Sequence, residues 1–274
     1  MSKILNLESF SEILATFWTE TPSSHSFSTK KSRIKGNCSG GDVFCVNSLS
    51  QCLELYQWNS TDFTENKKVL DQLSSNLQES IYSQNETATE QAIREIYHWG
   101  KVRLQTRGQP NASERWLEMH KGNGILIEKL CDSVKLVDDG RDFRRFDGSD
   151  LIMNSGFTKV VSLASSKNAP LIIFDGRVGA ALGNIAVMAC NELGFTNIAD
   201  NLFFPWGASQ SSHVNRNPSN DQFKFPRLFG GAQSHKVHAQ FMHISSLVVR
   251  KAAKQAGVDV REFEAALFMW GYSV

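Results

Sequence analysis

Residues 151–182 read LIMNSGFTKVVSLASSKNAPLIIFDGRVGAAL, and this stretch decides the fold that we expect. Its apolar start predicts a short helix that ends near Asn154. Ser155-Gly156-Phe157 then predicts a tight turn, since glycine adopts backbone angles that other residues avoid. A second helix is expected from Thr158, because the apolar residues that follow recur at helical spacing. Its apolar side comprises Val160, Val161, Leu163 and Ala164.

The second half of the stretch predicts a break, a linker and a long helix. Lys167-Asn168-Ala169-Pro170 ends the second helix, because proline interrupts helical backbone. Residues 171–174 form a short apolar run that leads to Asp175. Aspartate is a preferred N-cap residue, so we expect Asp175 to begin a long, weakly charged helix over residues 176–193.

The order of helix, hairpin turn, helix, linker, aspartate and helix resembles the helix-hairpin-helix superfamily of DNA glycosylases, especially the 8-oxoguanine DNA glycosylase type. In that type the hairpin ends in Thr-Lys-Val, which Thr158-Lys159-Val160 matches. A later stretch ends in a catalytic aspartate, which Ile173-Phe174-Asp175 matches. The match is confined to residues 151–182, and outside it we expect only a shared helical architecture.

The resemblance implies that Lys159 is a nucleophile that forms a Schiff base with deoxyribose, and that Asp175 is the catalytic carboxylate. Breaking an N-glycosidic bond builds positive charge on the sugar, which a neighbouring carboxylate stabilises. A lysine attacks only when it is neutral, and burial beside a helix N-terminus lowers a lysine pKa. The target base must first leave the duplex stack and enter a pocket.

The same resemblance implies a surface that contacts the DNA backbone. Backbone amides at the start of a helix form a natural phosphate site, and positively charged side chains pair with further phosphates. The residues that we expect to contact DNA are Ser155, Gly156, Phe157, Thr158, Arg177, His213 and Arg216. Of these, His213 and Arg216 belong to an irregular stretch, and long loops often carry function.

Each of these residues also has a structural interpretation. Aspartate at a helix N-cap stabilises a protein by about 1 kcal/mol without any catalytic role. Lys159 is otherwise an ordinary lysine on a helix face, and Arg177 an ordinary surface charge. His235, His238 and His243 share one helical region, where a polar face is more common than a metal site. We therefore expect no metal and no cofactor.

The remaining sequence is helical in period nearly throughout, and predicts the all-α class. Helices are expected over residues 4–18, 47–58, 63–82, 89–100, 112–136, 233–256 and 259–271, and Gly122 and Gly124 can split the fifth of these. Residues 138–150 resemble a connection, and residues 20–42 and 200–232 are irregular. The resemblance implies one glycosylase-like unit over residues 1–274, with two helical subdomains, 1–137 and 138–274, flanking a cleft.

Composition indicates the cellular compartment of the protein more clearly than its function. The formal net charge is +1, so bulk charge does not argue for nucleic acid, although Lys30, Lys31, Arg33 and Lys35 form a local basic run. The five cysteines form no CxxC pair, which favours a reducing compartment and argues against zinc. The first residues lack a signal-peptide pattern and no apolar stretch is long enough to cross a membrane, so we expect a cytoplasmic monomer.

The substrate base is left open between two classes. The resemblance implies an oxidised purine in double-stranded DNA. The turn carries one glycine, Gly156, where the family carries two, and the spacing from Lys159 to Asp175 is short for the family. These departures leave room for a hypermodified phage base such as glucosylated hydroxymethylcytosine, excised as an anti-phage defence. Two rival classes remain, a non-catalytic DNA-binding module and a helical interaction protein without a nucleic-acid role.

Overall fold

The computed structural model describes residues 3–28, 43–209, 214–228 and 232–274. The basic run at residues 30–35 and His213 lie outside the described residues. The chain divides into two compact units, and both are discontinuous in sequence. Unit 1 comprises residues 1–66, 175–229 and 245–274, and unit 2 comprises residues 67–174 and 230–244. The expected subdomains 1–137 and 138–274 stay a prediction.

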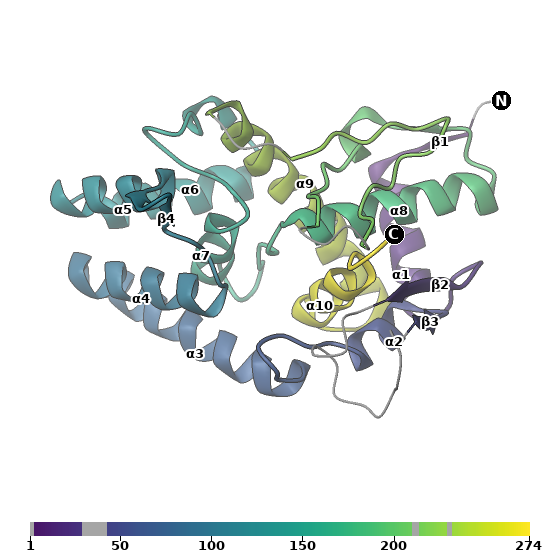
Figure 1. Cartoon of the computed structure of the whole chain (residues 1–274), viewed down its shortest axis with the longest axis horizontal. Helices are drawn as coiled ribbons and strands as arrows, with labels where there is room; N and C mark the ends of the chain where they lie inside the picture. Colours follow the sequence, from purple (N-terminus) through teal and green to yellow (C-terminus); the bar gives the residue numbers. More distant parts are fainter. Residues whose placement is uncertain (1–2, 29–42, 210–213, 229–231) are drawn as a thin grey trace. The chain divides into compact units, whose positions relative to one another are not determined.

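Helices dominate the described residues, which confirms the mostly helical class (Figure 1). The helices and strands of unit 1 are β1 (Ile4–Leu5), α1 (Leu7–Phe17), β2 (His25–Ser28), β3 (Val43–Val46), α2 (Leu49–Glu54), α8 (Gly176–Leu193), β6 (Asn197–Ile198), the 3-10 turn η2 (Asp200–Leu202) and α10 (Val260–Trp270). Helices α3 (Phe63–Tyr82) and α9 (Ala232–Ala256) contribute residues to both units.

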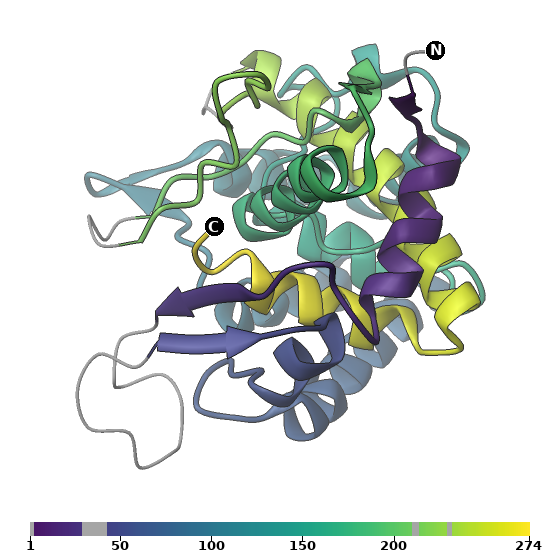
Figure 2. The same cartoon turned by 90° about the vertical axis from the view of Figure 1, so that its right-hand side faces the viewer.

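Unit 1 is built around α8 and α10, which contact each other, and α10 also contacts α2. Gly271, the residue that ends α10, lets this helix approach α8 closely: a Cβ at Gly271 would lie 1.9 Å from the backbone oxygen of Arg177. The indole Nε1 of Trp270 donates to Asn184 Oδ1 on α8 at 2.9 Å. Two pairs of short strands complete the unit, β1 with β6 in parallel and β2 with β3 antiparallel (Figure 2).

Unit 2 holds the candidate turn and the residues around it. Its elements are α4 (Glu86–Trp99), β4 (Gln105–Thr106), β5 (Gln109–Pro110), α5 (Ala112–Gly122), α6 (Leu126–Asp139), the 3-10 turn η1 (Phe143–Arg145) and α7 (Phe157–Ala164). The short helix α7 is buried against α4 and α6. In Figure 1 α3 and α4 run side by side, and the hydroxyl of Thr89 donates to that of Ser80 between them at 3.0 Å.

One predicted element of the decisive stretch is wrong. No helix ends near Asn154: α6 ends at Asp139, Gly140 follows with a left-handed φ of 68°, and residues 151–153 are not helical. These three residues are fully buried, and a short buried apolar run has no period that separates a strand-like segment from a helix. The turn before α7 is therefore preceded by non-helical chain rather than by a paired helix.

None of the described helices combines the length and the apolar character needed to cross a membrane.

Candidate functional site

Asn154 organises the turn that precedes α7. Its side-chain Oδ1 accepts hydrogen bonds from the backbone N–H groups of Gly156 at 2.9 Å and Phe157 at 3.0 Å. Its backbone oxygen accepts from Thr158 N at 2.9 Å, so the helical bonding begins here. Its Nδ2 donates to Ser113 Oγ on α5 at 3.0 Å. Sequence analysis did not single out Asn154, although asparagine is a preferred N-cap residue.

The bonds to Asn154 limit which groups of the turn are available to contact DNA. Two of the amides expected to bind phosphate, those of Gly156 and Phe157, already donate to Asn154. The side chains of Phe157 and Thr158 are fully buried, and the Phe157 ring lies 4.9 Å from the Trp116 ring, edge to face. Ser155 and Gly156 are half-buried, so they are the members of the predicted set that reach the surface of the turn.

Lys159 is held inside unit 2 rather than displayed on its surface. The residue is only 9% exposed. Its Nζ donates to the backbone oxygen of Ser155 at 2.8 Å, one helical turn earlier. Its aliphatic chain lies over Gly100, the residue that ends α4: a Cβ built there would lie 2.6 Å from Lys159 Cδ and 2.9 Å from Cε. A glycine at position 100 therefore makes room for the lysine.

A hydrogen bond links the chain just before Lys159 to the chain just before Asp175. The hydroxyl of Thr158 donates to the backbone oxygen of Phe174 at 3.1 Å. Farther along α7, Ser162 Oγ donates to the oxygen of Leu171 at 2.7 Å, and Leu171 N donates to Ser165 Oγ at 2.9 Å. The linker 171–174 therefore runs beside α7, and side chains of α7 satisfy its buried backbone groups.

Asp175 is the N-cap of α8, as predicted. Its φ and ψ of −120° and 179° are extended, and Oδ1 accepts from Arg177 N at 2.8 Å and Val178 N at 3.0 Å. Both of these bonds go to one carboxylate oxygen, and a carboxylate has lone pairs on two. The residue is half-buried. Because both capping bonds use Oδ1, Oδ2 can accept a hydrogen bond from another group.

An aromatic and charged cluster of unit 1 surrounds the start of α8. Burial raises the pKa of Tyr56, the negative charges of Glu264 and Asp175 raise it further, and the Arg177 guanidinium acts in the opposite direction. The Tyr56 hydroxyl therefore stays protonated, and its oxygen accepts from Asn66 Nδ2 at 2.9 Å. A neutral phenol near a carboxylate is a hydrogen-bond donor at neutral pH.

Both of the predicted DNA-contacting arginines contact Tyr272. The Arg177 guanidinium carbon lies 4.3 Å from the Phe268 ring centroid and 4.8 Å from that of Tyr272. Arg216 Nε donates to the backbone oxygen of Tyr272 at 3.2 Å. The structure thus brings Arg177 and Arg216 together in unit 1, a proximity that their separation in sequence did not indicate. Stacking on rings orients a guanidinium without using its N–H donors.

The three histidines of α9 bond to backbone groups. His235 Nδ1 lies 2.7 Å from the oxygen of Met153, His238 Nδ1 lies 3.0 Å from that of Ser234, and His243 Nδ1 lies 2.7 Å from that of Val137. Across the described ranges, no group of three or more His, Cys, Asp or Glu side chains is arranged to hold a metal ion.

Comparison of the chain with protein-family models, with curated proteins and with solved structures gave no match in any of the three. The resemblance to the DNA glycosylases therefore stays a prediction from residues 151–182.

Proposed function

We propose that the chain is a DNA glycosylase that excises a modified base from double-stranded DNA and leaves an abasic site. Lys159 is the nucleophile and Asp175 its partner carboxylate. The observation that carries the proposal is the burial of Lys159 at the start of α7, with Nζ held by the oxygen of Ser155. A lysine as buried as Lys159 is costly for a structural role alone, because burial penalises its charge. A glycosylase-like helical fold is part of this proposal, with the non-helical residues 151–153 in place of the first helix of the hairpin.

The proposed chemistry uses the neutral amine. The Lys159 ammonium first loses a proton to water, and the lysine lone pair attacks the anomeric carbon C1′ of the extruded nucleotide. The Asp175 carboxylate stabilises the positive charge that builds on the sugar. The C1′–N bond breaks, its electron pair leaves with the base, and the base takes up a proton. The nitrogen then loses a second proton to water, and the C1′–O4′ bond breaks as O4′ takes up the remaining amine proton. Water hydrolyses the resulting imine to the abasic site. The Nζ bond to the Ser155 oxygen orients the amine until it attacks C1′, because a neutral amine still donates.

The substrate that we propose is a hypermodified base of phage DNA, such as glucosylated hydroxymethylcytosine, which makes the protein an anti-phage defence enzyme. The supporting observation is the departure of the turn from the two-glycine form: Asn154 occupies the amides of Gly156 and Phe157. An oxidised purine such as 8-oxoguanine is the alternative substrate. The experiment below separates the two.

The test incubates the purified protein with unmodified DNA, with 8-oxoguanine DNA and with glucosylated phage DNA. Abasic sites and strand breaks are counted, and covalent imines are trapped with borohydride. We expect base release from the glucosylated DNA and a trapped adduct that Lys159→Gln abolishes. Release from 8-oxoguanine DNA alone would assign the protein to repair instead.

Two further outcomes decide the mechanism and the class. Base release that survives in Lys159→Gln but is lost in Asp175→Asn would replace the lysine by a water that Asp175 activates. Binding without release from any of the three DNAs would point to a DNA-binding module that uses the turn for backbone contact only. A protein that binds no DNA at low salt would contradict a nucleic-acid role altogether.

A further inference from the structure

A basic segment of unit 2 has no role in the function proposed so far. Residues 101–110, here called the basic hairpin, carry Lys101, Arg103 and Arg107, and Arg115 follows on α5. The acidic residue in this stretch, Glu114, is buried and its Oε1 lies 2.8 Å from Arg94 Nη2. The three arginines are exposed. Local positive charge is therefore concentrated here, although the whole chain is nearly neutral.

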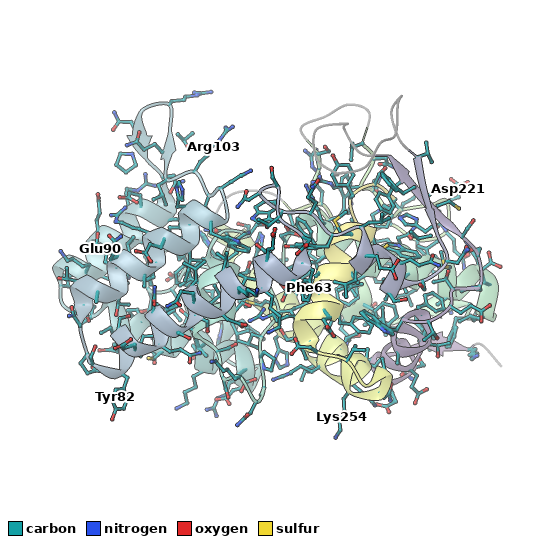
Figure 3. All side chains as sticks on the ribbon, turned by 90° about the horizontal axis from the view of Figure 1, so that it is seen from below. Phe63, Tyr82, Glu90, Arg103, Asp221 and Lys254 are labelled. Carbon is teal, nitrogen blue, oxygen red and sulfur yellow. The ribbon has the colours of Figure 1, made fainter. Side chains whose placement is uncertain are left out.

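The basic hairpin projects from the helices of unit 2, where Arg103 is labelled in Figure 3 (see also Figure 2). Strands β4 and β5 pair through a two-residue turn in which Arg107 has a φ of 52° and Gly108 a φ of 77°. Such turns favour asparagine or glycine at the first position, because other side chains are strained there. The chain nevertheless places an arginine at the tip.

The base of the hairpin is fixed to the start of α5. Asn111 N donates to the oxygen of Leu104 at 2.8 Å, and Asn111 Nδ2 donates to the oxygen of Arg103. Arg115 Nη1 donates to the oxygen of Pro110. A guanidinium has five N–H donors, so this bond leaves Arg115 able to bind a phosphate as well. These bonds fix the backbone at the base of the hairpin, and so fix where its arginine side chains begin.

The hairpin also begins beside the candidate nucleophile. Gly100, which precedes it, lies under the side chain of Lys159. Val102 lies on the turn before α7, since a Cβ at Gly156 would be 2.8 Å from Val102 Cγ1. Arg103 is the next residue. One short segment therefore passes from the lysine, across the turn, to the first arginine.

Arg103 and Arg115 line a cavity of about 660 Å³ together with Asn111, Ser113 and Asn154. Arginine, serine and asparagine side chains are among those that bind DNA phosphates. One carboxylate, that of Asp147, also lines the cavity. Its Oδ1 accepts from Ser149 N at 2.8 Å and Asp150 N at 2.9 Å, so its negative charge is partly compensated.

We propose that Arg103, Arg107 and Arg115 bind the phosphate backbone of double-stranded DNA next to the nucleotide that Lys159 attacks. This inference rests on the proposed function for its location on the DNA, and extends it by a second contact surface beyond the turn. We expect these contacts to be independent of the base sequence, because contacts to phosphates carry no sequence information. They position the duplex for the chemistry at Lys159.

The test measures binding of a fluorescent, unmodified duplex over a range of NaCl concentrations. The variant Arg103→Ala/Arg107→Ala/Arg115→Ala is compared with a control of equal charge, Lys68→Ala/Lys135→Ala/Arg144→Ala, whose side chains are exposed elsewhere in unit 2. We expect the arginine variant to bind roughly tenfold more weakly or worse at low salt, and its log Kd against log[salt] slope to be shallower by about 1 per arginine. The control keeps the wild-type slope.

A single variant guards against a folding defect. Arg107→Asn removes one charge at a position where asparagine is the preferred residue, so its thermal midpoint stays at or above that of the wild type. We expect its slope to be shallower by about 1. An unchanged slope and Kd in both Arg107→Asn and the triple arginine variant would overturn the inference.

Base release measured in a single turnover, with enzyme in excess, separates this inference from the proposed function. Release by the wild type together with unchanged DNA binding by the arginine variant would leave the glycosylase standing and reject the arginine contacts. Lost binding in the arginine variant, with no release from any DNA by the wild type, would keep the phosphate contacts and reject the glycosylase. A wild-type protein that binds no duplex at low salt would reject both.

Discussion

Gly100 and Lys159 are matched to each other. The lysine chain lies where a side chain on residue 100 would have to go, and the Nζ bond to the Ser155 oxygen sets the direction of the amine. A nucleophile displaced by about 1 Å loses roughly a hundredfold in rate. The space at residue 100 is therefore a direct requirement of the proposed chemistry.

Gly100→Ala is expected to reduce the borohydride-trapped adduct by roughly tenfold to a hundredfold. The free energy of unfolding changes by less than about 1 kcal/mol. Alanine loses less backbone entropy on folding than glycine does, and this gain offsets the cost of moving the Lys159 side chain. The matched control is Gly122→Ala at the end of α5, where a Cβ would meet nothing within 4 Å. Equal adduct yields in the two variants would contradict the role of this contact.

Asp175→Asn separates capping from catalysis. Asparagine caps a helix as well as aspartate does, so the free energy of unfolding falls by less than about 0.5 kcal/mol. Base release falls by at least roughly a hundredfold, since a neutral amide does not stabilise a positively charged sugar. Asp259→Asn is the control, because Asp259 caps α10 in the same way, with Oδ1 accepting from Arg261 N at 2.7 Å. Base release that persists in Asp175→Asn would return Asp175 to a purely structural role.

Asn154 fixes the turn before α7 to α5. The side chain bonds to two amides of the turn and to Ser113. Removal of these bonds frees the first turn of α7, and with it the carbonyl that holds Lys159. Stability and adduct formation should therefore be coupled here, unlike at other helix caps.

Asn154→Ala is expected to lower the free energy of unfolding by about 1–2 kcal/mol and to reduce the trapped adduct as well. Asn85→Ala is the comparison, because Asn85 caps α4 through Ala88 N at 3.0 Å. That variant should lose about 1 kcal/mol and keep the adduct yield. Chemical denaturation and borohydride trapping on the same samples measure both quantities.

Elements with a long, strong period could be predicted from the sequence. Residues 63–82 form α3, residues 176–193 form α8 with Asp175 as its cap, and the division of residues 112–136 falls at residues 123–125, between α5 and α6. Strands β2 and β3 were not expected, because each is four residues long and their pairing is set by tertiary structure.

The candidate site was predictable only in its separate parts. Lys159 and Asp175 follow from residue type and order. The bond from Thr158 to Phe174 and the contact of Gly100 with Lys159 join residues from different segments. No local pattern marks such contacts, since they depend on how the segments pack. The exposed arginines of the basic hairpin lie on irregular chain, where hydrophobic period gives no signal.

At the scale of the molecule, stability depends on pH through buried groups. His25 of unit 1 is 6% exposed, its ring lies 4.2 Å from the Trp270 ring, and its Nε2 donates to the oxygen of Trp270 at 3.0 Å. Burial lowers the pKa of His25 from 6.5 to about 4, against the opposing effect of the backbone oxygen of Trp270.

The protein should therefore lose stability as the pH falls from about 6.5 to about 4. In this window the unfolded chain binds a proton at His25 and the folded chain does not, so acid favours unfolding, by about 3 kcal/mol at its end. His25→Phe keeps a ring against Trp270 and cannot titrate. Urea unfolding across this pH range should show a flatter profile for His25→Phe, and parallel profiles would contradict the assignment.

The discontinuity of unit 1 bears on how the protein is made. Its first segment, residues 1–66, completes its core only with residues from the end of the chain, as His25 does with Trp270. During synthesis this segment leaves the ribosome long before α10 exists, with residues such as Phe10, Leu14 and Phe17 uncovered. Most of unit 2 emerges in one piece between the two ends. We expect unit 2 to gain structure on the ribosome, and unit 1 to close only once α10 has emerged, with chaperones shielding its early helix meanwhile.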